Sequence, residues 1–172
     1  YKEETLHEQL ASVNETLNQA MTNIRESVHD LHDDSVDLEQ AMSEVLCPMR
    51  QKYQVRFDYD MGKAIPRNVK YCFLMAAKEA MSNIIKHSNA DEITVTLREH
   101  PVLYQLKIED NGTRKGIIVS QPQAERIVLG SQGMGLANMK SRVENLNGTF
   151  RVSNEQGFLI FISIPKGEHC EK

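Results

Sequence analysis

The sequence predicts an α+β fold, in which a long helical stalk precedes an α/β sandwich with a mixed, mostly antiparallel sheet and helices on one face. Apolar residues near the N-terminus recur every three or four positions, which is the period of one helical face. Later segments alternate apolar and polar residues, as half-buried strands do. Segments of helical period separate these strands, so the chain of 172 residues is expected to form one layered domain with a helical extension.

The N-terminal segment is predicted to be a bundle or coiled-coil helix, because no Pro or Gly interrupts its apolar positions. These positions are Leu6, Leu10, Val13, Leu17, Met21, Ile24, Val28 and Leu31. Since the pattern starts immediately at Tyr1, we expect the sequence to be cut from a longer protein.

A break in this pattern predicts where the stalk changes direction. Polar residues occupy the apolar stripe at positions 33–35, and either Asp34 or Ser35 is expected to cap a second, shorter helix. We therefore expect an incomplete dimerisation stalk over residues 1–50 and a globular domain over residues 51–172.

The globular domain is predicted to contain five strands, two helices and one long loop. Pro66 suits the start of a helix whose broad apolar face continues to His87, and a second helix is predicted between Leu136 and Leu146. Residues 113–133 sustain no period, and a loop of that length inside a compact domain is commonly a lid over a functional site. Alternation predicts the strands over residues 53–60, 92–98, 102–109, 149–153 and 158–164.

The composition argues against several classes of function. The net charge is −4 with acids and bases mixed, so no basic stripe supports nucleic-acid binding. Cys47, Cys72 and Cys170 are widely spaced and no Cys/His cluster has metal-ligand spacing, which argues against a disulfide framework or a zinc site and favours a reducing, cytoplasmic location. No apolar run reaches the roughly 20 residues of a membrane span. We therefore expect no membrane contact within this chain, and any anchor of a parent protein would lie outside it.

A polar edge near the end of the first predicted helix suggests a site. Glu79, Asn83 and His87 are spaced four residues apart, so they share one edge of the helix, and Lys86 lies beside them. The alternative interpretation is a solvated helix end, where the helix dipole favours Lys and His.

Two further segments have the residue types of a nucleotide site. Gly133-Met134-Gly135-Leu136 opens the second predicted helix, and unhindered backbone N–H groups at a helix start can hold phosphate. The alternative is a simple helix-entry turn.

Asp110 and Gly112 follow the third predicted strand. The Asp110 carboxylate could accept a hydrogen bond from a nucleobase amino group, and Gly112 could let a flat ligand approach the backbone. The alternative for this pair is a tight turn.

In their order and spacing, these segments resemble the Bergerat ATP-binding fold shared by histidine kinases, gyrase-type ATPases, Hsp90 and MutL. Residues 133–148 look like the second glycine box of histidine kinases of the NarL-partner type, and residues 78–87 look like the asparagine box of that family. The resemblance covers about residues 27–165.

The resemblance implies a role for each residue of the polar edge. Asn83 would coordinate a Mg²⁺ ion that bridges the ATP phosphates, which suits a cation that prefers oxygen ligands. Glu79 would orient water or the metal, Lys86 would pair with a phosphate oxygen, and His87 would lie near the phosphates or beneath them.

The other two segments would hold the nucleotide. By the same resemblance, Asp110 would accept a hydrogen bond from the adenine amino group, Gly112 would make room for the ring, and the backbone of residues 133–136 would hold the phosphates under the lid. Catalysis would then consist mostly of positioning and charge stabilisation.

The chain departs from the pattern of the family at two glycines. Residues 113–115 delay the next glycine of the first glycine box to Gly116, which puts the hinge of the lid in doubt. Phe158 and Leu159 follow Gly157 where the family has threonines, so a common contact near adenine is missing.

A third departure is that no convincing phosphoacceptor histidine is present. His29-Asp30 resembles the acceptor motif, but residues 23–38 look like the second helix of the family's hairpin. We therefore expect His29 to be structural and the acceptor histidine to lie upstream of Tyr1.

The function implied by the resemblance is that of an ATP-dependent protein-histidine kinase. The γ-phosphoryl group of ATP would pass to a histidine of the stalk and then to a response regulator. The intact protein would dimerise through its N-terminal helix. One alternative is a serine-kinase anti-sigma factor, although such proteins lack a long heptad stalk. Another is a non-catalytic scaffold with a decayed ATP site, against which the intact Glu79, Asn83 and Asp110 argue.

Overall fold

The computed structural model describes residues 36–112, 134–153 and 157–167. The chain forms two compact units, Tyr1–Val36 and Asp37–Lys172, and the second contains all the elements described below. The helix predicted up to Leu31 and the predicted lid at residues 113–133 lie outside the described residues.

Five strands form one sheet with the order β1-β2-β3-β5-β4. β1 and β2 are parallel, and the other neighbouring pairs are antiparallel. The prediction of a mixed, mostly antiparallel sheet is therefore confirmed. The strands are β1 (Gln54–Asp60), β2 (Glu92–Glu99), β3 (Leu103–Asp110), β4 (Thr149–Ser153) and β5 (Phe158–Pro165).

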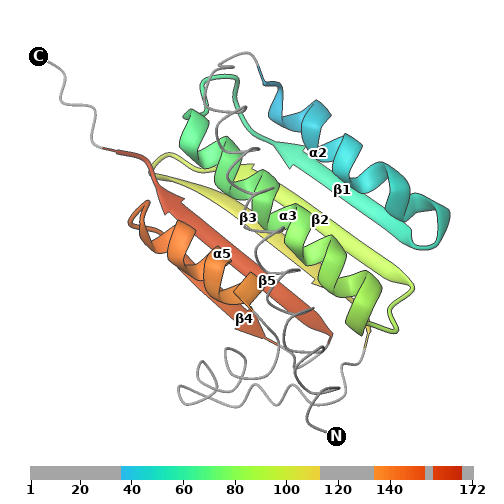
Figure 1. Cartoon of the computed structure of the whole chain (residues 1–172). Coiled ribbons are helices and arrows are strands. Elements are labelled where there is room, and N and C mark those ends of the chain that lie inside the picture. Colours follow the sequence, from blue (N-terminus) through green and yellow to red (C-terminus); the bar gives the residue numbers. More distant parts are fainter. Residues whose placement is uncertain (1–35, 113–133, 154–156, 168–172) are drawn as a thin grey trace, which may run out of the picture. The chain divides into compact units, whose positions relative to one another are not determined.

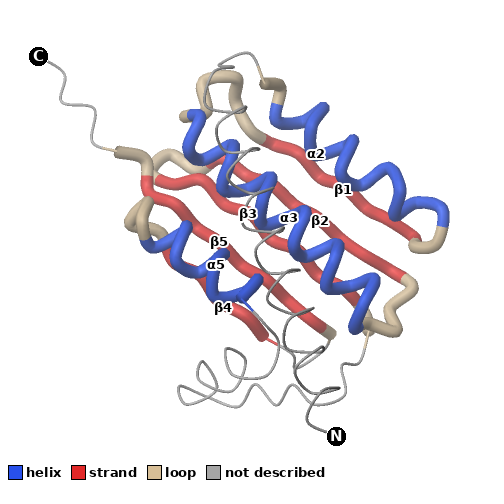
Figure 2. The backbone as a smooth tube through the Cα atoms, viewed as in Figure 1, coloured by secondary structure: helices blue, strands red, loops and turns tan. Residues whose placement is uncertain are grey.

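The described helices cover a single face of this sheet, as predicted (Figure 1). They are α2 (Leu38–Leu46), α3 (Arg67–His87) and α5 (Met134–Glu144), and a short 3₁₀ helix, η1 (Cys47–Gln51), follows α2. The tube view shows the same two layers, with each helix running along the strands beneath it (Figure 2). No helix in the described ranges is long and apolar enough to cross a membrane.

The N-cap of α2 differs from the prediction. The Asp37 carboxylate accepts a hydrogen bond from the backbone N–H of Gln40 at 3.1 Å. Asp37 directly precedes the first helical turn, where a side-chain oxygen can reach an N–H group three residues ahead. Asp34 and Ser35, the expected caps, lie before this position and outside the described residues.

The helix α2 packs into the core of the sheet domain. Its apolar residues Leu38, Met42 and Leu46 are 2%, 0% and 0% exposed and belong to the same buried cluster as the central strands. The compact unit thus starts at Asp37, whereas the sequence placed the start of the globular domain near residue 51. That the residues before Asp37 form a dimerisation stalk stays a prediction.

The strand register brings the site segments to one end of the sheet. Asp110, the last residue of β3, pairs with Ile93 near the start of β2 and with Phe158 at the start of β5. Only four residues, 88–91, connect the end of α3 to β2. The C-terminal end of α3 therefore lies at the same end of the sheet as Asp110.

An Asn-Gly pair closes the turn that follows the last helix. Asn147 has a φ of 54°, in the left-handed region, and the N–H of Gly148 donates to the carbonyl of Val143 at 2.9 Å. This closure satisfies a free carbonyl at the end of the helix and turns the chain into β4.

Candidate functional site

The last two turns of α3 carry the predicted polar edge. Glu79 and Asn83 are half-buried, whereas Lys86 and His87 are exposed in the last turn. Cationic side chains are stabilised at this end of a helix by its dipole. The edge therefore combines two sheltered oxygen-bearing side chains with two groups that reach solvent.

Asp110 is the only buried polar or charged residue in the described part of the chain, with 4% of its surface exposed. Its Oδ1 accepts hydrogen bonds from Ser88 Oγ at 3.1 Å and from the backbone N–H of Gly112 at 2.9 Å. A buried carboxylate is costly unless donors compensate for its lost hydration. These two donors hold a hydrogen-bond acceptor in place at the end of the sheet.

The environment of Gly112 gives a reason for this glycine that the sequence did not suggest. A Cβ atom at Gly112 would overlap Ser88 Oγ and would lie 2.7 Å from the backbone nitrogen of Ala90. The space beside Gly112 is thus filled by the segment that follows α3, whereas the sequence predicts a flat ligand there. Whether Gly112 also borders a ligand stays a prediction.

Glu79 lies against the start of α5. A Cβ atom at Gly135 would overlap the Glu79 Oε1 atom and would lie 2.5 Å from Glu79 Cδ, so only glycine allows this approach. A carboxylate at a helix N-terminus is stabilised by the helix dipole. Leu136, the next residue, is buried and anchors the start of α5 in the core.

The structure therefore brings the three predicted segments together. Ser88, at the end of α3, contacts Asp110, and Glu79, on the same helix, contacts Gly135. Gly133 lies outside the described residues, as does the side chain of Met134. The same holds for Gly116 and for His29.

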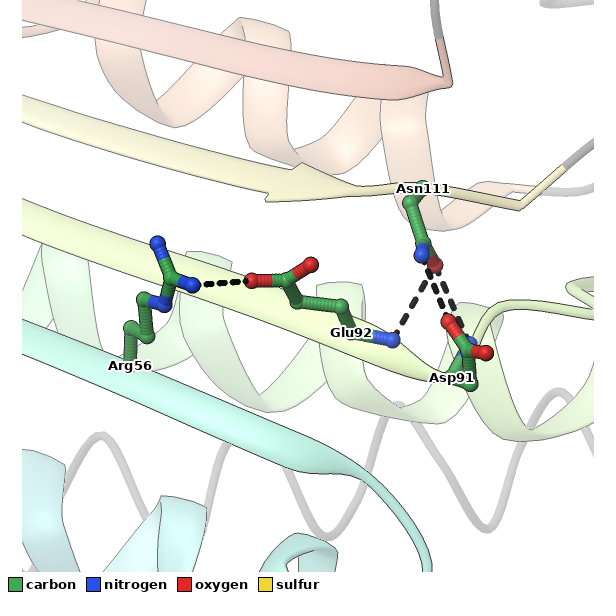
Figure 3. A network of polar contacts seen from close by, with 4 residues as sticks. All are labelled: Arg56, Asp91, Glu92 and Asn111. Carbon is green, nitrogen blue, oxygen red and sulfur yellow. Dashed lines mark hydrogen bonds and ion pairs between the residues drawn. The ribbon is translucent and has the colours of Figure 1, made fainter.

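A polar network next to Asp110 was not predicted from the sequence (Figure 3). Asn111 Oδ1 accepts hydrogen bonds from the backbone N–H groups of Asp91 and Glu92, each at 3.0 Å, and Asn111 Nδ2 donates to Asp91 Oδ1 at 2.5 Å. Arg56 forms an ion pair with Glu92 at 3.0 Å. The side chain of an Asn after a strand commonly forms hydrogen bonds with nearby backbone groups. This signal in the sequence could have identified the hydrogen bonds between the end of β3 and the start of β2.

The glycine before β5 packs on the end of β3. Gly157 has a φ of 102°, and a Cβ atom there would overlap the carbonyl oxygen of Asp110. Phe158, which stands where the resembled family has a threonine, is 3% exposed and belongs to the core. This departure from the family therefore adds a buried aromatic side chain beside Asp110.

The oxygen-bearing side chains fit a magnesium ion that is carried by a nucleotide. In the described ranges, no group of three or more His, Cys, Asp and Glu side chains could hold a metal ion by itself. Mg²⁺ is usually held by one or two protein oxygens together with phosphates and water. Asn83 and Glu79 could supply such ligands, although no dedicated metal cage is present in those ranges.

Comparison with known proteins supports the resemblance. Residues 73–168 match the family described as histidine kinase-, DNA gyrase B-, and HSP90-like ATPase. Over 121 residues the chain is 30% identical to the sensor histidine kinase LiaS of Bacillus subtilis, with 70% of this chain and 31% of LiaS covered. Over 105 residues it is 30% identical to the nitrate/nitrite sensor protein NarX of Escherichia coli, with 60% of this chain and 16% of NarX covered.

A solved structure shares the fold. The histidine kinase AdeS of Acinetobacter baumannii superposes with a TM-score of 0.60 at 19% identity, over 95% of this chain and 85% of that chain. The predicted α/β sandwich is therefore confirmed, whereas the predicted helical stalk lies outside the described residues. The chain spans less than a third of LiaS and of NarX, and both relatives are named as sensors. Neither of them is named as an anti-sigma factor or a scaffold.

Proposed function

Because the chain belongs to the family of histidine kinase-, DNA gyrase B- and HSP90-like ATPases, we propose that it is the ATP-binding catalytic region of a two-component sensor histidine kinase. One observation carries this proposal. The end of α3 contacts both other segments, through Ser88 on Asp110 and through Glu79 on Gly135. A solvated helix end would not require these contacts between distant parts of the chain.

In this proposal, the Asp110 carboxylate recognises adenine. It accepts a hydrogen bond from the 6-amino group, which is strengthened by the charge of the acceptor. Hypoxanthine and guanine present a carbonyl oxygen at position 6, and two acceptors repel each other. The site would therefore prefer adenine nucleotides.

The start of α5 and the facing edge of α3 would bind the phosphates. Backbone N–H groups at the start of a helix favour anions, and Lys86, which is exposed, would reach a phosphate oxygen. His87 would lie beside the phosphates. Asn83 would hold Mg²⁺ with the help of Glu79, and the bound ion would neutralise part of the phosphate charge.

The phosphotransfer reaction belongs to the whole protein. A histidine nitrogen attacks the γ-phosphorus, a P–N bond forms, and the bond to the bridging oxygen breaks so that ADP leaves. We place the accepting histidine N-terminal to Tyr1 and not at His29, and we expect a response regulator to receive the group next. Dimerisation through the N-terminal helix would bring the accepting histidine and the ATP-binding region together.

Calorimetric titration with ATP in the presence of Mg²⁺ tests the proposal. We expect binding at or below millimolar nucleotide, and we expect Asn83→Ala to lose the part of the affinity that depends on Mg²⁺. The fold should survive this change, because Asn83 lies on the polar edge and not in the core. Asn145→Ala, at an exposed position after α5, is the matched control. The absence of both binding heat and a thermal shift would contradict the proposal.

A further inference from the structure

Ser88 holds the buried carboxylate of Asp110 through a chain of hydrogen bonds. The backbone N–H of Ala90 donates to Ser88 Oγ at 3.1 Å, and Ser88 Oγ donates to Asp110 Oδ1 at 3.1 Å. The N–H of Gly112 donates to the same carboxylate oxygen at 2.9 Å. Both acceptor directions of Oδ1 are thus occupied by donors of the protein itself.

The direction of the serine proton follows from its neighbours. A hydroxyl group has one proton to donate and two lone pairs to accept with. The Ala90 N–H can only donate, so Ser88 Oγ accepts from it. An ionised Asp110 can only accept, so the proton of Ser88 points toward Oδ1. No rotation of the hydroxyl group satisfies both neighbours in another way.

The backbone around Ser88 keeps the hydroxyl group in this position. Ser88 directly follows α3, and its N–H donates to the carbonyl of Ile84 at 3.0 Å, which fixes it to the end of the helix. On its other side, any side chain at Gly112 would overlap Ser88 Oγ. The position of this hydroxyl group is therefore set by two separate segments.

We infer that Ser88 is a positioning residue that fixes the rotation of the Asp110 carboxylate and thereby sets the preference of the site for adenine. This inference rests on the proposed function. With Oδ1 held by two donors, the second carboxylate oxygen takes a fixed direction. Without the hydroxyl group of Ser88, Oδ1 loses one of these two donors, so the rotation of the carboxylate about its Cβ–Cγ bond is less restrained.

The test compares ATP with inosine triphosphate in the full chain. The two nucleotides share the ribose and the phosphates, and they differ in having an amino group or a carbonyl oxygen at position 6 of the base. Calorimetry gives the ratio of their dissociation constants for the wild type and for Ser88→Ala, Ser88→Thr and Ser163→Ala. Ser163 is a half-buried serine of β5 and serves as the matched control.

We expect Ser88→Ala to reduce the preference for ATP by about tenfold, the effect of losing one hydrogen bond to a charged group. Ser88→Thr, which keeps the hydroxyl group, and Ser163→Ala should retain the wild-type ratio. If Ser88 had a merely structural role, Ser88→Ala would weaken the binding of both nucleotides equally. An unchanged ratio of the two dissociation constants in Ser88→Ala would therefore overturn the inference. A loss of the preference for ATP in Ser88→Thr as large as that in Ser88→Ala would also overturn the inference.

Two controls separate the possible failures. If thermal unfolding shows that Ser88→Ala does not fold, Ser88→Cys replaces it, because a thiol is a weak donor of similar size. It should also lose the preference, and a wild-type ratio in Ser88→Cys would then overturn the inference. A wild-type chain that binds neither nucleotide, or that binds both equally, contradicts the proposed function. A wild-type chain that prefers ATP, with the same preference in Ser88→Ala, contradicts the inference alone.

Discussion

Glu99 connects three segments at the end of the sheet opposite Asp110. Its Oε1 accepts a hydrogen bond from Lys166 Nζ at 2.5 Å, and its Oε2 accepts one from the backbone N–H of Gly62 at 2.6 Å. The hydrogen bond from Lys166 and then that from Gly62 lower the pKa of Glu99 below its usual value of 4.5. The folded state therefore favours the ionised carboxylate more than the unfolded state does.

The stability contributed by Glu99 should depend on pH. Because its pKa is lower in the folded state, the contribution is fully present above the unfolded pKa of 4.5 and is lost as the pH falls through the folded value. We expect Glu99→Gln to lower the free energy of unfolding by about 1 kcal/mol at neutral pH. This difference from the wild type should shrink in acid, as measured by urea unfolding across the pH range.

Glu144→Gln is the control for this prediction. Glu144 pairs with Lys140 at 3.9 Å and its side chain is 58% exposed, so its removal should have little effect at any pH. A difference between wild type and Glu99→Gln that stays constant down to acid pH would show that the charge of Glu99 is not the cause.

The sequence indicates the segments that the structure brings together, but it does not indicate their contacts. The sequence indicates Asp110 because an acidic residue at a strand end near a glycine suits ligand binding. In the structure, Asp110 is the buried acid of the described residues. Ser88 was missed, because it is 22 residues away from Asp110 and no local pattern indicates that they meet. The overlap of a Gly112 side chain with Ser88 is hidden from the sequence for the same reason.

The secondary structure elements followed the prediction within a few residues, because their periods are local properties. The strand predicted over residues 53–60 is Gln54–Asp60, and the helix predicted from Pro66 to His87 is Arg67–His87. The order of the strands could not be read in this way. β5 lies between β3 and β4, and such pairing depends on contacts between distant segments.

The contact between α3 and α5 predicts the effect of a single methyl group. In Gly135→Ala the new Cβ would overlap the end of the Glu79 side chain, which is flexible enough to move away. We expect the displaced carboxylate to separate the two site segments and to weaken ATP binding by about tenfold, equivalent to roughly 1.4 kcal/mol. The fold should persist, because alanine favours a helix by about 1 kcal/mol over glycine.

The control for this prediction is Gly167→Ala, since a Cβ atom at Gly167 would have no atom within 4 Å. Thermal unfolding and calorimetry of both variants separate stability from affinity. Wild-type ATP affinity in Gly135→Ala would show that the approach of Glu79 to α5 has no role in binding.

At the scale of the whole molecule, α2 belongs to the compact unit Asp37–Lys172, whereas the division into a stalk and a catalytic domain near residue 50 stays a prediction. The sequence pattern of α2 has the same helical period as the N-terminal segment, so the sequence predicts a single stalk for both, with a break at positions 33–35. Periodicity identifies the apolar face of a helix but does not show which surface that face meets. The structure assigns the face of α2 to the core of unit Asp37–Lys172.

This assignment predicts different outcomes for two shortened chains. A chain that begins at Asp37 keeps every buried residue of the compact unit, so it should unfold cooperatively and bind ATP as the full chain does. A chain that begins at Gln51 lacks Leu38, Met42 and Leu46, and burying three such side chains contributes on the order of 5 to 9 kcal/mol. That amount is comparable to the ~5–15 kcal/mol that keeps a whole domain folded. The Gln51 chain should therefore show no cooperative thermal transition by circular dichroism and no ATP binding. A Gln51 chain that folds and binds ATP would show that the compact unit does not need α2.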